Sequence, residues 1–256
     1  MRCVPSTPAR DAAYFDDWYA AMPASPLKDQ IEQRHLGLPP HLLSTSLLPW
    51  SGIADVVAAL QLTSDDTLLD LACGRGGYGL EMAARIGCRL VGVDFSAEAV
   101  RQATEHARGL GRAAEFRVGD LVATGLAAGS VDGVVCIDAI QFAGQSASAY
   151  AELRRVLTPG GRAVLTSWEP LDRDDDHVSE RLRSVDLAGG LAAAGFQNVD
   201  VLDRSDWKAV EQAMWEEARA LDPGADPALR SFHEEGVRAR DLSPRLRRVM
   251  ATATAS

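Results

Sequence analysis

The chain has 256 residues and a formal net charge of −10, with 46% hydrophobic and 24% charged residues. Its length fits one large α/β domain, and its composition excludes disordered, collagen-like and coiled-coil chains. The acidic balance disfavours nucleic acid as a partner. Because the sequence has no signal-peptide pattern near its start and no apolar run long enough to cross a bilayer, we expect a cytoplasmic protein without membrane contact.

Residues 1–50 carry scattered aromatic side chains and several prolines, which predicts short helices and loops without a strand. Beyond residue 53, short apolar runs alternate with helical stretches. The runs are rich in β-branched and large aliphatic residues, as the strands of a buried parallel sheet are. They cover residues 67–72, 89–94, 114–120, 131–138 and 161–168.

Helical patterns separate these runs. Residues 78–86 have apolar side chains at helical spacing, and a second pattern at 96–107 begins at Ser96, a favourable N-cap residue. A third helix is predicted at 147–157. Such an alternation requires right-handed crossovers and a parallel sheet with helices on both faces.

The alternation stops after the fifth run. A charged stretch, 171–182, is followed by a small helix and a sixth strand within 187–203. Residues 207–242 are mostly helical in pattern. Residues 246–255 alternate in hydrophobicity and predict a last strand, which we expect to be antiparallel and at the edge of the sheet.

Together these patterns predict a doubly wound α/β fold with a seven-stranded, mostly parallel, Rossmann-like sheet. We expect residues 1–52 to form an N-terminal helical cap and residues 53–256 to form the core. Residues 171–187 and 205–244 are expected to be cap or lid insertions, the second of them a helical insert before the last strand.

The most informative segment is the glycine-rich turn within Asp70–Gly77. Glycines there let the backbone turn tightly, and the helix that follows offers free N–H groups, which suits a nucleotide-derived cofactor. The pattern Gly74-x-Gly76-x-x-Gly79 also matches the dinucleotide fingerprint, so an NAD-dependent oxidoreductase is one alternative.

Acidic residues end four successive runs, and they favour a cationic cofactor. A carboxylate beside a pyrophosphate is repulsive, whereas a carboxylate beside an ammonium or sulfonium group is attractive. The chain also lacks a Tyr-x-x-x-Lys pair, because lysine occurs only at positions 28 and 208. Both observations favour S-adenosyl-L-methionine over NAD. The four acids are Asp70, Asp94, Asp120 and Asp138.

Several segments, taken in order, make the sequence resemble the class I S-adenosylmethionine-dependent methyltransferases. They are 68-LLDLACGRGG-77, 91-VGVDFSAEAV-100, 119-GDL-121, 134-VVCIDAIQF-142 and 153-LRRVLTPGGRAVLT-166. The sequence departs from the family pattern at Ala72, where the family usually has glycine. The resemblance implies the cofactor S-adenosyl-L-methionine and the product S-adenosyl-L-homocysteine.

The resemblance also implies which residues contact the cofactor. Asp70 would hold its methionine part, Asp94 would bind the ribose hydroxyls and Phe95 would lie against the adenine. Asp120 would contact the adenine amino group. For the strand-end acids, capping of the next element is the alternative interpretation. The full predicted set is Asp70, Ala72, Cys73, Gly74, Asp94, Phe95, Gly119, Asp120, Leu121, Ile137, Asp138 and Gln141.

The acceptor is expected to bind to segments outside the shared core. Their aromatic side chains suit an aromatic or otherwise apolar small molecule, although packing of the cap onto the core is the alternative. The cap itself resembles that of bacterial natural-product methyltransferases, which implies secondary metabolism such as antibiotic biosynthesis. The predicted acceptor contacts are Tyr14, Trp50, Phe142 and Trp168.

The chemistry expected at this site is an in-line displacement at a sulfonium carbon, for which proximity and orientation supply most of the catalysis. A base is needed only for a poorly ionised acceptor, and we take His177 as the first candidate, with a solvated loop residue as the alternative. The acidic loop Asp172–Asp176 is interpreted as a solvated face, so no metal is predicted.

We therefore expect a methyltransferase that acts on a small molecule, as a monomer or a homodimer. Oxygen is the favoured target atom, with nitrogen and carbon open. Two alternatives stay open: a protein that binds S-adenosylmethionine but acts as a non-methylating helper or cyclase, and the NAD-dependent oxidoreductase.

Overall fold

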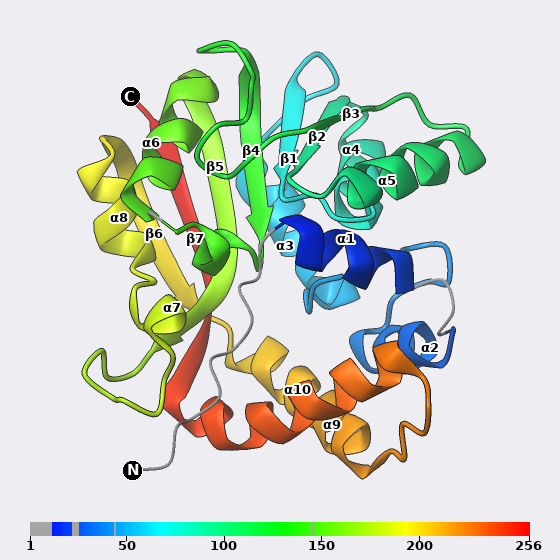
Figure 1. Ribbon diagram of the computed structural model, residues 1–256. Coiled ribbons are helices and arrows are strands. Elements are labelled where there is room, and N and C mark those ends of the chain that lie inside the picture. The colour runs from blue at the N-terminus through cyan, green and yellow to red at the C-terminus, as the bar shows by residue number, and fades with distance from the viewer. Residues whose placement is uncertain (1–11, 22–25, 44, 145) are drawn as a thin grey trace.

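The computed structural model describes residues 12–21, 26–43, 45–144 and 146–256. Residues 1–11 and 22–25 of the predicted cap lie outside the described part of the chain. Its centre is one seven-stranded sheet in the order β3-β2-β1-β4-β5-β7-β6 (Figure 1). The strands are β1 (Thr67–Leu71), β2 (Arg89–Asp94), β3 (Glu115–Val118), β4 (Val131–Ile137), β5 (Leu157–Pro170), β6 (Phe196–Asp203) and β7 (Leu246–Ala255).

The predicted doubly wound α/β fold is confirmed, and one detail is corrected. Strands β1 to β5 pair in parallel, with Leu71 opposite Val93 in the β1–β2 register. Strand β7 is antiparallel to both β5 and β6, as predicted for its direction. It does not lie at the edge, because it is inserted between β5 and β6, with Val164 of β5 opposite Thr252. The strand at this edge of the sheet is β6, and β3 is at the opposite edge.

Helices cover both faces of the sheet. They are α1 (Ala12–Ala21), α2 (Pro26–Leu36), α3 (Trp50–Leu60), α4 (Gly77–Ile86), α5 (Ala97–Gly109), α6 (Ser146–Val156), α7 (Glu180–Arg183), α8 (Leu187–Ala193), α9 (Ser205–Ala220) and α10 (Pro227–Leu242). The side chains of neighbouring strand residues point to opposite faces. Leu68 therefore joins the core under α3 and α4, whereas Leu69 joins the core under α6 and α8.

This two-sided burial explains the sequence pattern. All five residues of β1 are buried, so the strand reads as a continuous apolar run with one acid. The N-cap expected at the start of α5 is present, because the side chain of Ser96 accepts a hydrogen bond from the backbone N–H of Ala99.

Helices from both ends of the chain form a cap beyond the carboxyl ends of the strands (Figure 1). α2 packs on α9 and α10, and Glu217 of α9 pairs with both Arg34 and His35 of α2. The predicted cap and the predicted insertion at 205–244 are therefore parts of one layer. Within the described ranges, no helix combines the length and the apolar character that a membrane span requires.

Candidate active site

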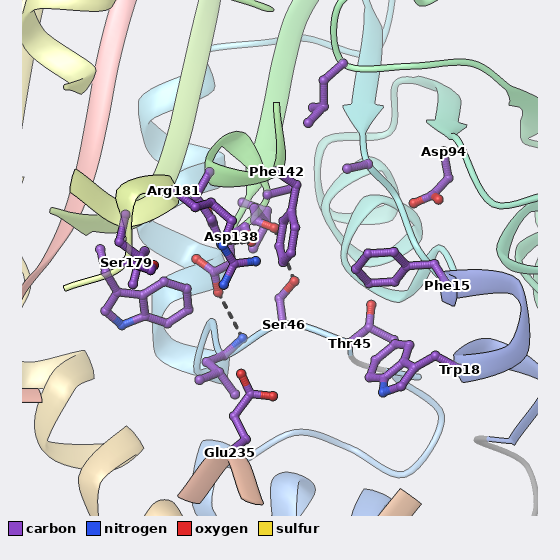
Figure 2. A pocket seen from close by; sticks show the side chains of 18 of the residues that line it. Phe15, Trp18, Thr45, Ser46, Asp94, Asp138, Phe142, Ser179, Arg181 and Glu235 are labelled. Carbon is purple, nitrogen blue, oxygen red and sulfur yellow. Dashed lines mark hydrogen bonds between the residues drawn. The ribbon is translucent and has the colours of Figure 1, made fainter. Parts of the chain in front are cut away.

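A cavity of about 1070 Å³ lies between the carboxyl ends of the strands and the cap helices. Sites for a single small ligand usually measure ~300–1,000 Å³, so this cavity has room for a cofactor and a second small molecule. In Figure 2, Asp94 and Phe15 lie toward one end, Arg181 and Ser179 toward the other, and Phe142 between them. All five residues line the cavity.

The glycine-rich turn after β1 forms one end of the site. Ala72 has a φ of 61° and Gly74 a φ of 51°, both in the left-handed region that favours glycine. A side chain at Gly74 would collide with the hydroxyl groups of Thr45 and Tyr19. The turn therefore needs glycine at position 74 and tolerates alanine at position 72 at some cost in strain.

Asp70 lies beneath this turn and supports it. Its side chain is 2% exposed, and its Oδ2 accepts a hydrogen bond of 3.1 Å from the backbone N–H of Gly79 in the first turn of α4. Burial raises the pKa of Asp70 to about 7. A bound pyrophosphate would need this same helix N-terminus, which already carries a carboxylate.

Asp94 ends β2 and joins two elements of the site. Its Oδ2 accepts a hydrogen bond of 2.9 Å from the backbone N–H of Gly74, and its Oδ1 accepts one of 3.0 Å from the N–H of Ser96. The side chain is 3% exposed, and burial raises its pKa to about 6. Because each carboxylate oxygen can accept a further bond, Asp94 retains capacity to bind two hydroxyl groups.

The loop after β3 lies beside Asp94 at the same end of the cavity. Gly119, Asp120 and Leu121 line the cavity, and Oδ1 of Asp120 accepts a hydrogen bond of 3.0 Å from the N–H of Val122. The carboxylate of Asp120 is thus held at the start of the loop. It keeps its other oxygen for a donor such as an amino group.

Asp138 ends β4 with a φ of 58°, and both oxygens of its carboxylate have partners within the protein. Its Oδ1 accepts a hydrogen bond of 2.6 Å from Thr166 Oγ1 and pairs at 2.6 Å with Arg248 Nη1. Its Oδ2 accepts a bond of 2.9 Å from the N–H of Leu47. Gln141 donates from Nε2 to the carbonyl of Asp138 at 2.7 Å. Asp138 therefore orders this wall of the cavity.

The partner of Asp138 belongs to a buried network that the sequence analysis missed. Arg248 of β7 is fully buried and also pairs with Glu211 of α9 at 2.6 Å. The other oxygen of Glu211 accepts a hydrogen bond of 2.9 Å from the indole N–H of Trp168, and burial raises the pKa of Glu211 to about 7. The only sequence signal was an arginine at a core-facing position of a predicted strand.

Aromatic rings and several charged groups form the other walls of the cavity. Phe15, beside Asp94, packs at 5.5 Å between ring centroids, edge to face, on Phe142. Lys28 and Glu32 of α2 also line the cavity. The aromatic residues that line the cavity outside the cofactor loops are Tyr14, Phe15, Trp18, Tyr19, Phe142, Trp168, Trp215 and Phe232.

Residues 68–161 match the profile of a methyltransferase domain family. This range holds the glycine-rich turn and the acids that end β1, β2 and β4. The middle of the chain therefore contains a methyltransferase domain.

Curated methyltransferases are similar to this chain over part of their length. Sterol 24-C-methyltransferase of Eremothecium gossypii is 29% identical over 57% of this chain and 44% of its own length. Phosphoethanolamine N-methyltransferase of Triticum aestivum is 27% identical over 71% of this chain and 37% of its own. The chain thus spans less than half the length of these relatives.

Solved structures share the fold of this chain. Phosphoethanolamine N-methyltransferase 2 of Haemonchus contortus superposes with a TM-score of 0.70 at 18% identity, over 82% of this chain and 54% of that one. The [4+2]-cyclase SpnF gives a TM-score of 0.68 at 21% identity, over 80% and 81%. Geranyl diphosphate C-methyltransferase of Streptomyces coelicolor gives 0.63 at 20% identity, over 80% and 79%.

Most of the residues predicted to contact ligands line this cavity. Those predicted for the cofactor that line it are Ala72, Asp94, Phe95, Gly119, Asp120, Leu121, Ile137, Asp138 and Gln141. Those predicted for the acceptor that line it are Tyr14, Phe142 and Trp168. Asp70, Cys73 and Gly74 lie behind the lining instead, because they form the turn itself.

Two of the predicted site residues lie away from the cavity. Trp50 begins α3, and its ring stacks on the guanidinium of Arg85 at 4.3 Å. His177 is exposed in the loop after β5, where Oδ1 of Asp175 accepts hydrogen bonds from its N–H and its ring, both at 2.9 Å. In the described part of the chain, no histidine lines the cavity and no group of three His, Cys, Asp or Glu forms a metal site.

Proposed function

We propose that this chain transfers a methyl group from S-adenosyl-L-methionine to an oxygen atom of a small aromatic or apolar molecule. One observation carries the proposal: a single cavity runs from the acids at the strand ends to an aromatic wall formed by the cap. A reaction between a cationic nucleoside cofactor and an apolar acceptor needs both environments in contact.

The residues at the cofactor end fit S-adenosylmethionine. Asp94 would accept hydrogen bonds from the ribose hydroxyls with the oxygen lone pairs that its two backbone donors leave. Asp120 would accept from the adenine amino group. In their ionised form, the buried carboxyl groups of Asp70 and Asp94 add negative potential around the sulfonium charge, which supports this cofactor over NAD.

In the mechanism that we propose, the cofactor supplies an activated methyl group. The protein positions the acceptor and excludes water from the cavity. The network around Asp138 holds the wall of the cavity at the end of β4. Phe15 and Phe142 pack together and exclude water from this region. Orientation of the acceptor oxygen along the line of attack then supplies most of the rate enhancement.

A second candidate is a protein that binds the cofactor and reorganises a substrate without methylating it, such as a cyclase. The observation that favours it is that, in the described residues, no histidine lines the cavity and the carboxylate of Asp138 is already paired. A hydroxyl acceptor that ionises poorly would then lack an evident base at the end of β4.

Calorimetric titration of the purified protein with S-adenosylmethionine, S-adenosylhomocysteine and NAD tests the cofactor class. We expect the first two to bind and NAD not to bind, and Asp94→Ala to lower the affinity by at least tenfold. Binding of NAD alone would contradict the proposal. Formation of S-adenosylhomocysteine in the presence of phenolic acceptors separates methyl transfer from the cyclase alternative.

The resemblance of the cap to natural-product methyltransferases supports a role in secondary metabolism, such as antibiotic biosynthesis, as part of the same proposal. A cytoplasmic location, the lack of a nucleic acid partner and a monomeric or homodimeric state remain predictions from the sequence.

A further inference from the structure

The cavity contains a buried ion pair that the proposed reaction does not use. Lys28 and Glu32 are one helical turn apart on α2, and the ammonium of Lys28 bonds to Oε1 of Glu32. The two residues are only 4% and 5% exposed, and both line the cavity. Figure 1 shows α2, which carries this pair, on the side of α1 away from the carboxyl ends of the strands.

The pair has unused hydrogen-bonding capacity. Among the residues that the structure describes, none donates a hydrogen bond to Oε2 of Glu32, although this atom is buried. The ammonium of Lys28 has three donors, of which the described residues take one through Glu32. Buried polar atoms are normally satisfied, so an open acceptor beside open donors on a cavity wall indicates a ligand position.

Aromatic rings surround this polar spot. The Nζ atom of Lys28 lies 5.9 Å from the centroid of the Trp18 ring and 5.6 Å from that of Phe232. Phe232 in turn packs on Trp215 at 5.4 Å between ring centroids. A ligand that reaches the ion pair must therefore pass its body between aromatic side chains, which favours a flat apolar molecule.

The local charge balance selects a neutral group. The ion pair sums to zero, and the nearby pair of Asp29 and Arg75, at 2.9 Å, also cancels. A carboxylate ligand would be attracted by Lys28 but repelled by Glu32, and an ammonium ligand would meet the reverse. A hydroxyl group accepts one hydrogen bond from the ammonium and donates one to Oε2, so it satisfies both without adding charge.

We propose that Lys28 and Glu32 form a subsite that binds a neutral hydroxyl group on an aromatic methyl acceptor. The proposal rests on the proposed function, whose acceptor class it narrows. The subsite orients the end of the acceptor remote from the reacting atom, and it rejects analogues that lack the hydroxyl group because they leave both buried partners unsatisfied.

The test uses four probes that share one naphthalene ring: 2-naphthol, 2-methylnaphthalene, 2-naphthoate and 2-naphthylmethylammonium. Each is titrated into the full chain by fluorescence, with and without S-adenosylhomocysteine. We expect 2-naphthol to bind about tenfold more tightly than 2-methylnaphthalene. In the variant Lys28→Met/Glu32→Leu this ratio falls to about one, because an apolar pair replaces the ion pair. Such replacements usually preserve folding, which circular dichroism checks.

The matched control is Arg101→Met/Glu105→Leu, an exposed pair with the same spacing on α5, which should keep the tenfold ratio. Equal binding of 2-naphthol and 2-methylnaphthalene, tightest binding of either ionic probe, no binding of any probe, or a ratio that survives in the Lys28 variant would each overturn the subsite. Failure of S-adenosylhomocysteine to bind would instead contradict the proposed function, and the probe ratios without it would still decide on the subsite.

Discussion

Arg248 and Asp138 form a buried ion pair of 2.6 Å that ties the antiparallel strand β7 to the end of β4. Because Arg248 also pairs with Glu211, one guanidinium holds the core and the cap helix α9 together directly beneath the cavity. The guanidinium carbon of Arg248 also lies 4.3 Å from the centroid of the Trp168 ring. The wall of the site is therefore organised by a charge that never reaches the cavity itself.

Removal of this charge should destabilise the protein strongly. Arg248→Met leaves two buried carboxylates without their partner, and we expect the free energy of unfolding in urea to fall by about 3 kcal/mol. Adding Glu211→Gln to that variant removes one of the orphaned charges and should recover part of the loss. Arg240→Met, at an exposed position of α10, is the control and should change stability by less than about 0.5 kcal/mol. A loss that small for Arg248→Met would show that the network carries no stability.

Asp70 should make the protein less stable as the pH rises. Burial raises its folded-state pKa to about 7, above the ordinary value of 3.8. A carboxyl group with a raised folded pKa supports folding fully below its unfolded pKa, and this support is lost as the pH rises from about 4 through 7. Over that window, we expect the wild-type protein to lose on the order of 3 kcal/mol relative to Asp70→Asn.

Urea unfolding of both proteins at pH 4, 5.5 and 7.5 measures this difference. Asn keeps an oxygen that accepts from the N–H of Gly79, so the glycine-rich turn is retained in the variant. Parallel pH profiles for the two proteins would contradict the assignment to Asp70. The variant Asp65→Asn, at an exposed position before β1, should follow the wild-type profile.

The alanine that departs from the family pattern should cost stability. Ala72 has a φ of 61°, where a residue with Cβ is strained by roughly 1–2 kcal/mol. Ala72→Gly relieves this strain but adds freedom to the unfolded chain, so a net gain of at most about 1 kcal/mol is expected. Ala72→Val should lose about 1–2 kcal/mol, because β-branching worsens the strain. Thermal unfolding measures both, and equal melting temperatures would contradict the strain argument.

Local sequence patterns predicted the parts of this site that come from single strand ends. Asp94 and Asp120 follow consecutive runs of the predicted parallel sheet, and the carboxyl ends of parallel strands lie at one edge, so their sequence positions were enough to bring them together. Strand β7 was wrongly predicted to lie at the edge of the sheet, because the sequence patterns of β6 and β7 do not specify which strands lie beside them. The pairing of β7 with β5 is decided by long-range packing.

The ion pairs around the site were less predictable, because they join residues that are far apart in the sequence. Nothing near Arg248 in the sequence points to Asp138 or Glu211, and nothing near Lys28 indicates that its helix faces a cavity. His177 was predicted as a candidate base because it lies in the loop after the fifth strand. In the structure, its hydrogen bonds to Asp175 keep it at the surface. In a loop, the spacing of residues in the sequence does not predict the direction in which a side chain points.

Asp16 should hold α1 over the cofactor end of the cavity. Its Oδ1 accepts hydrogen bonds from Ser96 Oγ at 2.5 Å and from the N–H of Glu98 at 3.1 Å, next to Asp94. Because α1 carries Phe15 into the cavity, we expect Asp16→Ala to speed dissociation of S-adenosylhomocysteine about tenfold, as measured by stopped-flow fluorescence. Asp17→Ala, the exposed neighbour on the same helix, should leave this rate unchanged. If both variants released the ligand at the wild-type rate, α1 would not act as a closure over the cofactor.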